Sequence, residues 1–148
     1  MNKLINISEA SSIAIHSLSL IAKLDQSINA TQIANLTGFS KNHLSKILQL
    51  LVKHDYLKSS RGPKGGFVLI KDPKEISLLE IYELIEGAHS DNYCFDHSPV
   101  CPFQDCIYGD IIQDISMRFI DAFKKRTIAD IKLKPNISYQ SILEKLNR

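Results

Sequence analysis

The chain has 148 residues, of which 44% are hydrophobic and 23% are charged, and its formal net charge is +2. This composition is ordinary for a soluble globular protein and fits one domain, or a small domain with an added dimerisation arm. No apolar run approaches the ~20 residues that cross a bilayer, so we expect no membrane helix. The N-terminus lacks the long apolar segment of a signal peptide, and we therefore expect a cytoplasmic protein.

The first predicted element is a helix over residues 8–24, which is rich in small and aliphatic side chains. We expect it to pack beneath the following helices as the third member of a three-helix core. His16 lies among these apolar residues. A lone histidine in such a position is most often a satisfied core or interface residue.

Residues 29–54 have the pattern of a helix-turn-helix. Asn29 is expected to cap a short helix, with Gln32 reaching back to complete a capping box. Gly38 is expected to end this helix in the left-handed conformation. Ser40 is then placed to cap a second helix, whose apolar residues recur at helical spacing and predict one buried stripe.

Residues 56–60 and 67–70 read as two short strands. The tip between them, Arg61–Gly66, contains turn-forming residues and two cations. A basic hairpin directly after a recognition helix is a wing, which is positioned to contact phosphates or to enter the minor groove. The sequence therefore predicts a winged helix-turn-helix.

Basic charge is concentrated in this region. Residues 41–71 contain one acid, Asp55, and these cations: Lys41, Lys46, Lys53, Lys58, Arg61, Lys64 and Lys71. We therefore predict binding to double-stranded DNA. The predicted DNA contacts come from the start of the second helix and from the wing: Ser40, Lys41, Asn42, His43, Ser45, Lys46, Arg61, Lys64, Gly65 and Gly66. The alternative is a winged helix that binds protein through solvated lysines.

A capping box at Ser77 and Glu80 predicts a helix that ends at Gly87 and connects the winged domain to the rest of the chain. Residues 107–126 then predict a long helix with apolar side chains on more than one face. Since one winged domain cannot cover both faces, we expect a C2 homodimer, which would match a palindromic operator. The alternative is that this helix folds fully against its own domain.

Two elements are predicted near the C-terminus. Residues 127–131 should form a short extra turn, which could return to the neighbouring subunit. Residues 138–146 have the apolar spacing of a final amphipathic helix, to which the sequence assigns no role.

Three cysteines, Cys94, Cys101 and Cys106, lie in one proline-containing loop. In a reducing compartment such a group suggests metal or redox chemistry rather than a structural disulfide. Iron–sulfur clusters and zinc generally take four ligands, so one ligand is missing from the cysteines. The candidates for it are His16, His97, Asp96 and His89, with Glu9 and Ser12 as weaker possibilities.

Other interpretations of the cysteines remain open. They are a structural zinc site, a thiol switch that forms a disulfide, and cysteines without a shared role. A zinc site would normally show Cys-x2-Cys pairs, which this loop lacks. No arrangement of nucleophile, base and oxyanion donors indicates an enzyme.

Taken together, these features resemble the Rrf-type (IscR/NsrR) family of bacterial winged-helix transcription regulators over about residues 4–133. The segments that carry the resemblance are Gln32–Ala34, Ser40–Leu44, Arg61–Phe67, Ile76–Ile81 with Glu86–Gly87, the three-cysteine loop and Thr127–Ile131. The resemblance implies a mainly α fold with a two-stranded wing and a long C-terminal dimerisation helix. It also implies a homodimeric repressor or activator whose DNA affinity depends on an iron–sulfur cluster, of the [2Fe-2S] or [4Fe-4S] type.

The resemblance places Cys94, Cys101 and Cys106 on the family's ligand positions. The IscR branch uses a histidine just after the third cysteine, but this chain continues with Ile107. The NsrR branch uses a first-helix aspartate, where this chain has Ser12. One relative uses a first-helix acid and a histidine one turn later, and His16 is similar to that histidine. His16 is therefore the predicted fourth ligand.

The predicted organisation has four parts: a DNA-binding domain (1–87), a cluster-binding loop (88–106), a dimerisation region (107–133) and a tail (134–148). The predicted function is transcription regulation in response to redox state, nitric oxide or iron–sulfur status. The alternative is a regulator of the same fold that has no cluster and is controlled by a thiol switch or by a protein partner.

Overall fold

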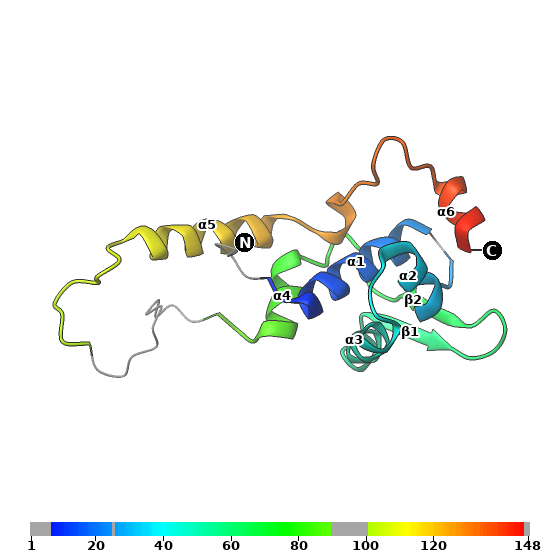
Figure 1. The fold of residues 1–148 in the computed structure, drawn as a ribbon, viewed down its shortest axis with the longest axis horizontal. Coiled ribbons are helices and arrows are strands. Elements are labelled where there is room, and N and C mark those ends of the chain that lie inside the picture. Colours follow the sequence, from blue (N-terminus) through cyan, green and yellow to red (C-terminus); the bar gives the residue numbers. More distant parts are fainter. Residues whose placement is uncertain (1–6, 25, 90–100, 147–148) are drawn as a thin grey trace.

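The computed structural model describes residues 7–24, 26–89 and 101–146 (Figure 1). The elements in chain order are α1 (Glu9–Leu24), α2 (Ala30–Thr37), α3 (Lys41–Lys53), β1 (Leu57–Ser60), β2 (Gly66–Leu69), α4 (Leu78–Glu86), α5 (Ile111–Lys125), the 3-10 helix η1 (Ile128–Asp130) and α6 (Tyr139–Leu146). This confirms the predicted mainly helical winged helix-turn-helix with a two-stranded wing.

Helices α1, α2 and α3 pack together as the predicted three-helix core. The capping box at Asn29 is confirmed, because its side chain accepts the Gln32 N–H and the Gln32 side chain accepts the Asn29 N–H. Gly38 ends α2 at φ 78°, a left-handed conformation that favours glycine. Ser40 is the N-cap residue of α3, as predicted, but the side-chain cap expected there is wrong. Its side chain makes no capping hydrogen bond, although its carbonyl oxygen accepts the Leu44 N–H at 2.9 Å.

The wing is an antiparallel pair in which Leu57 lies opposite Leu69 and Ser60 lies opposite Gly66. Its strands differ by one residue from the predicted bounds. Residue Ile28, just before α2, adds a bridge to the outer side of β2 through two backbone hydrogen bonds with Phe67, of 3.2 and 2.8 Å. The wing is therefore fixed to the chain segment that enters the helix-turn-helix.

The hydrophobic core lies between these helices and the wing. Its largest fully buried side chains come from almost every element before α5 and from η1: Ile13, Leu18, Leu24, Ile28, Ile33, Leu44, Leu48, Leu51, Leu57, Ile76, Ile81 and Ile128. Burying such a side chain contributes about 1.5–3 kcal/mol relative to leaving it exposed. This shared core therefore holds the helices and the wing together as one winged domain.

Helix α5 begins later than predicted, at Ile111 rather than at residue 107. The intervening residues form a turn in which the Gly109 N–H donates to the Cys106 carbonyl at 2.8 Å, with Gly109 at φ 59°. The helix contacts α4 through an aromatic group, because Tyr82 packs edge-to-face on Phe119 and Phe123 at centroid distances of 5.2 and 5.8 Å. No residue of α5 is buried.

The chain after α5 returns to its own winged domain. The Leu78 N–H donates to the Arg126 carbonyl and the Ile128 N–H donates to the Ile76 carbonyl, both at 2.9 Å. Ile128 is fully buried. The expectation that this turn could return to a neighbouring subunit is therefore wrong, since its apolar side chain fills the core of its own chain.

The final helix packs against α2, the first helix of the helix-turn-helix. Ile142 and Leu146 are buried, and the Gln32 side-chain amide donates to the Leu146 carbonyl at 3.2 Å. The tail thus has the structural role that the sequence did not assign. Within residues 7–24, 26–89 and 101–146, no helix combines the length and the apolarity needed to cross a bilayer.

Candidate nucleic-acid interface and cysteine loop

Helix α3 has one buried face and one polar face. Its buried residues are Leu44, Ile47, Leu48 and Leu51, which hold the helix against the core. Lys41, Asn42 and Lys46 are exposed at its start, as predicted for residues that read DNA. Asn and Lys side chains can form hydrogen bonds with base edges in the major groove.

The other two residues of α3 that were predicted to contact DNA are less exposed and have partners within the chain. Ser45 is half-buried, and its hydroxyl donates to the Lys41 carbonyl at 2.9 Å. His43 is also half-buried, and its Nδ1 lies 3.3 Å from a carboxylate oxygen of Glu9 on α1. Glu9 was a weak candidate for the missing cluster ligand, and here it lies beside His43 rather than beside a described cysteine.

The wing tip presents two exposed cations, Arg61 and Lys64. Neither forms an ion pair with an acid in the described part of the chain. The tip is closed by a hydrogen bond from the Gly65 N–H to the Gly62 carbonyl at 2.9 Å. This arrangement can place positive charge against the phosphate backbone without first breaking an internal ion pair.

The two adjacent glycines of the wing permit close backbone approach. A Cβ at Gly65 would lie 2.5 Å from the Ser60 carbonyl oxygen, and a Cβ at Gly66 would lie 2.6 Å from the Ile28 carbonyl carbon. Gly66 is buried, so its place in the predicted DNA-contact set is not matched by exposure. Its position allows the strand before α2 to bridge the wing.

Lys71, which the sequence counts among the basic residues, is exposed but contacts two side chains of its own chain. Its Nζ lies 4.0 Å from the centre of the Tyr56 ring and 3.9 Å from a carboxylate oxygen of Glu80. The Tyr56 hydroxyl donates to Glu80 at 2.6 Å. Burial, followed by this hydrogen bond and the charge of Glu80, raises the pKa of Tyr56 well above its usual value. Sequence reasoning missed this cluster, which connects the wing to the capping box of α4.

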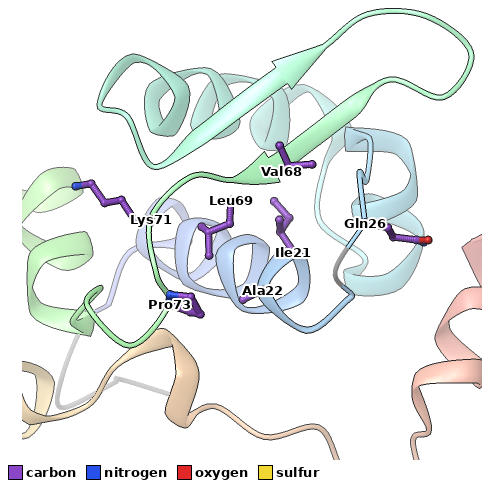
Figure 2. Close-up of a pocket in the computed structure, with 7 residues that line it drawn as sticks. All are labelled: Ile21, Ala22, Gln26, Val68, Leu69, Lys71 and Pro73. Atoms are coloured by element: carbon purple, nitrogen blue, oxygen red, sulfur yellow. The ribbon is translucent and has the colours of Figure 1, made fainter.

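A cavity of about 270 Å³ lies next to this region, between α1 and β2 with the residues that follow it (Figure 2). Figure 2 shows Ile21 and Leu69 side by side within it, while Lys71 and Gln26 lie at its edges. Since its lining brings no nucleophile together with a base, we assign it no catalytic role.

The cysteine loop connects the C-terminal end of α4 to the N-terminal end of α5. At its start, Ser8, which precedes α1, and Ser11 of α1 donate hydrogen bonds to the carboxylate of Glu86, the last residue of α4. The Ser11 hydrogen bond, followed by that of Ser8, holds the pKa of Glu86 below its usual value. His89, another candidate ligand, contacts the Glu83 carboxylate. The beginning of the loop is thus fixed to α1.

At the other end of the loop, Cys101 and Cys106 are exposed and neither forms a disulfide. Cys94, Asp96 and His97 lie outside the described residues, so the predicted set of three thiols stays a prediction. In the parts of the chain that the structure describes, no three His, Cys, Asp or Glu side chains gather into a metal site.

His16 lies on α1 with its side chain exposed. Its Nδ1 is 2.7 Å from the Ser12 carbonyl, and its ring packs edge-on against Phe39 at a centroid distance of 5.5 Å. Figure 1 shows the loop that follows residue 100 beyond the start of α5, at the opposite end of the molecule from the wing. Within one chain, the structure therefore does not bring His16 together with Cys101 and Cys106.

Residues 7–133 match the Rrf2 family, whose description is "Iron-dependent Transcriptional regulator". This match covers the winged domain, the cysteine loop, α5 and η1. The chain belongs to the Rrf2 family.

Two relatives illustrate the extent of the Rrf2 likeness. The chain is 30% identical to the HTH-type transcriptional regulator NsrR of Geobacillus kaustophilus over 140 residues, which is 88% of this chain and 91% of that protein. It is 39% identical to BadM of Rhodopseudomonas palustris over 74 residues, which is half of this chain and 47% of that protein. Transcription regulation and DNA binding are thus properties of the family to which the chain belongs.

Solved structures share the fold. IscR from T. potens has a TM-score of 0.68 at 19% identity, with 86% of this chain and 85% of that chain covered. The oxidized form of Staphylococcus aureus CymR also has a TM-score of 0.68, at 20% identity, with 88% of this chain and 99% of that chain covered. These Rrf2-like structures support the winged-helix fold described above.

Proposed function

We propose that this protein is a homodimeric transcription regulator whose operator affinity is controlled by an iron–sulfur cluster. The proposed ligands are Cys94, Cys101, Cys106 and His16. The observation that carries the proposal is the pair of exposed, unpaired thiols of Cys101 and Cys106 at the entrance to α5, in a family described as iron-dependent.

The proposed DNA contacts divide into two groups. Lys41, Asn42 and Lys46 present exposed polar groups at the start of α3, where they can reach base edges in the major groove. Arg61 and Lys64 on the wing are free to neutralise phosphates or to enter the minor groove. Two such units in a dimer would read the two halves of a palindromic operator.

The proposed dimer rests on the surface of α5. Ile111, Ile115 and Met117 have exposed fractions of 66%, 37% and 54% in the single chain. Ile111 and Ile115 lie one turn apart on one face of the helix, whereas Met117 lies on another face, and exposed apolar side chains such as these are costly to leave in water. A second copy of α5 would cover Ile111 and Ile115, and its two-fold symmetry would match that of the operator.

The donor atoms on the described residues suit such a cluster. Thiolates with an imidazole are a donor set that iron–sulfur centres accept. The contact of His16 Nδ1 with the Ser12 carbonyl favours the tautomer with hydrogen on Nδ1, which leaves Nε2 available as a ligand atom. Because His16 is apart from Cys101 and Cys106 within one chain, we infer that the His16 ligand comes from the second copy.

A cluster at these residues would supply a centre whose oxidation, nitrosylation or loss can be sensed. The chain's own residues would carry the response. The cysteine loop is attached to α1 through Glu86 and leads directly into α5, so a change in its conformation would change how the two winged domains are spaced. A coupling of ~1–3 kcal/mol, or roughly 5–150-fold in operator affinity, would suffice.

The alternative is a regulator without a cluster that responds through reversible oxidation of its thiols. The exposure of Cys101 and Cys106 favours it, because accessible thiols are the ones that oxidise. The S. aureus CymR neighbour, of the same fold, was solved in an oxidized form.

Anaerobic purification tests the proposal, with a visible absorption spectrum and assays of iron and acid-labile sulfide. A coloured protein with matched iron and sulfide is expected. The His16→Ala variant should then bind the cluster more weakly, while His54→Ala, an exposed histidine at the end of α3, should not. Colourless protein after anaerobic reconstitution would rule out the cluster and favour the thiol switch. Measuring operator affinity in each state then tests the coupling separately.

A further inference from the structure

A cavity of about 480 Å³ lies between α1 and the chain that follows α5. One wall comes from α1, and the other comes from residues 126–137, which lead from α5 past α1 toward α6 (Figure 1). This volume is within the range of about 300–1,000 Å³ that small-molecule sites occupy. The cavity is separate from the polar face of α3 and from the wing.

The walls of the cavity are mainly apolar. Ile15 and Leu20 line it from α1, and Ile131, Leu133 and Ile137 line it from the opposite segment. That segment is held in shape by a turn in which the Ile137 N–H donates to the Lys134 carbonyl at 2.9 Å. The cavity can therefore remove apolar ligand surface from water.

Positive charge surrounds this apolar surface. Four cations, Lys23, Arg126, Lys132 and Lys134, line the cavity, and among the residues that the structure describes no acid lines it. Lys23 extends from α1 to the opposite segment, where its Nζ lies 3.3 Å from the Ala129 carbonyl. A nearby acid, Asp130, accepts hydrogen bonds from the N–H and hydroxyl of Thr127 at 2.8 and 2.9 Å, and its charge also interacts with Arg126 and Lys132.

We propose that this cavity binds an anionic amphiphile, namely a carboxylate with a medium-length apolar chain. Burial of the chain supplies the larger part of the binding free energy, since this term grows with apolar area removed from water. The cations select the carboxylate, because a neutral ligand with the same chain gains nothing from them. Lys134 and Ile137 lie beyond the family match, which ends at residue 133, so these two residues of the wall belong to the tail of this chain.

This site goes beyond the proposed cluster function and does not depend on it. His16 also lines the cavity, so a bound carboxylate would lie near the imidazole that we propose as a cluster ligand. The binding measurement uses the full-length protein after its cluster content has been determined. A result on the amphiphile is therefore distinct from a result on the cluster.

Isothermal titration with decanoate, below its micelle concentration, tests the proposal, with decan-1-ol as the uncharged comparison. We expect saturable binding of decanoate at one molecule per chain and a rise in Tm, because a ligand that binds only the folded state stabilises it. The alcohol should bind more weakly. The double variant Lys132→Ala/Lys134→Ala should weaken decanoate binding by about 5-fold or more, because two cations are lost.

A matched control removes two cations elsewhere. Lys53→Ala/Lys58→Ala makes the same change in net charge on exposed residues outside the cavity, and decanoate should bind this variant as it binds the native protein. Equal weakening in both variants would show a general charge effect and overturn the proposal. A fall in Tm, or no saturable binding because a second copy of the chain fills the cavity, would overturn it as well.

Discussion

The side-chain amide of Gln32 donates to the backbone carbonyl of Leu146 at 3.2 Å. This hydrogen bond joins α2, the first helix of the helix-turn-helix, to α6. The side-chain carbonyl of the same glutamine accepts the Asn29 N–H at 3.0 Å and completes the capping box of α2. One residue thus fixes both the start of α2 and the position of α6. The tail is part of the folded winged domain.

The first prediction concerns this tail. Ile142→Ala should lower the free energy of unfolding by about 2 kcal/mol, because it removes a nearly buried side chain from the interface between α6 and α2. Urea denaturation measures the effect. Glu144→Ala, at an exposed position of the same helix, should change stability by less than about 0.5 kcal/mol. Equal stability of the two variants would show that α6 contributes nothing to the core.

The second prediction concerns the wing. Arg61→Ala should weaken binding to all DNA sequences and reduce the slope of log affinity against log salt by about one unit, because one phosphate contact is lost. Fluorescence anisotropy at several salt concentrations measures this slope. Lys74→Ala, an exposed cation outside the wing, is the control and should leave the slope unchanged. An unchanged slope in the Arg61 variant would remove this residue from the interface.

The third prediction concerns the glycine at the base of the wing. Gly66→Ala should destabilise the protein by about 1–3 kcal/mol, because its Cβ would meet the Ile28 carbonyl carbon at 2.6 Å and force the two segments apart. Ser59→Ala, an exposed position on the paired strand, serves as the control in thermal denaturation. If both variants have the Tm of the native protein, the close approach of Gly66 to Ile28 does not limit the size of the residue at this position.

The fourth prediction concerns pH. The pKa of Glu86 is lowered in the folded state by the hydroxyls of Ser11 and Ser8, so its contribution to stability is present above the ordinary value of 4.5 and is lost as the pH falls through the lower folded value. Glu86→Gln should therefore lose less stability than the native protein on acidification below about pH 5. Denaturation at a series of pH values measures this difference, and Ser8→Ala/Ser11→Ala should reproduce it. Parallel profiles would contradict the role of these hydrogen bonds.

The winged domain was predictable from sequence because its helix ends depend on residues that are close together in the chain. The capping boxes at Asn29 and Ser77 depend on residues three positions apart, and both are present. The left-handed end of α2 depends on a single glycine, Gly38. The start of α5 was predicted four residues too early, because apolar periodicity continues through Ile107 while the turn closed at Gly109 interrupts the helix.

Contacts between distant segments were not predictable in the same way. The pairing of Ile28 with Phe67, the hydrogen bonds from Ser8 and Ser11 to Glu86 and the packing of α6 on α2 join residues far apart in the chain. No periodicity or spacing in the sequence specifies these partners. The same holds for the cysteine site. His16, the predicted fourth ligand, lies on α1, and within one chain the structure does not bring it together with Cys101 and Cys106.

Among the described residues, α5 is attached to its own chain through its C-terminal half, and this has a mechanical consequence. That half is held by the paired backbone hydrogen bonds around Leu78 and Ile128 and by the packing of Phe119 and Phe123 on Tyr82, whereas the N-terminal end carries the cysteine loop. A 15-residue helix is roughly 22 Å long, so a tilt of α5 about these contacts moves its two ends by different distances. The displacement is largest at the end that carries the thiols and smallest at the end next to the winged domain.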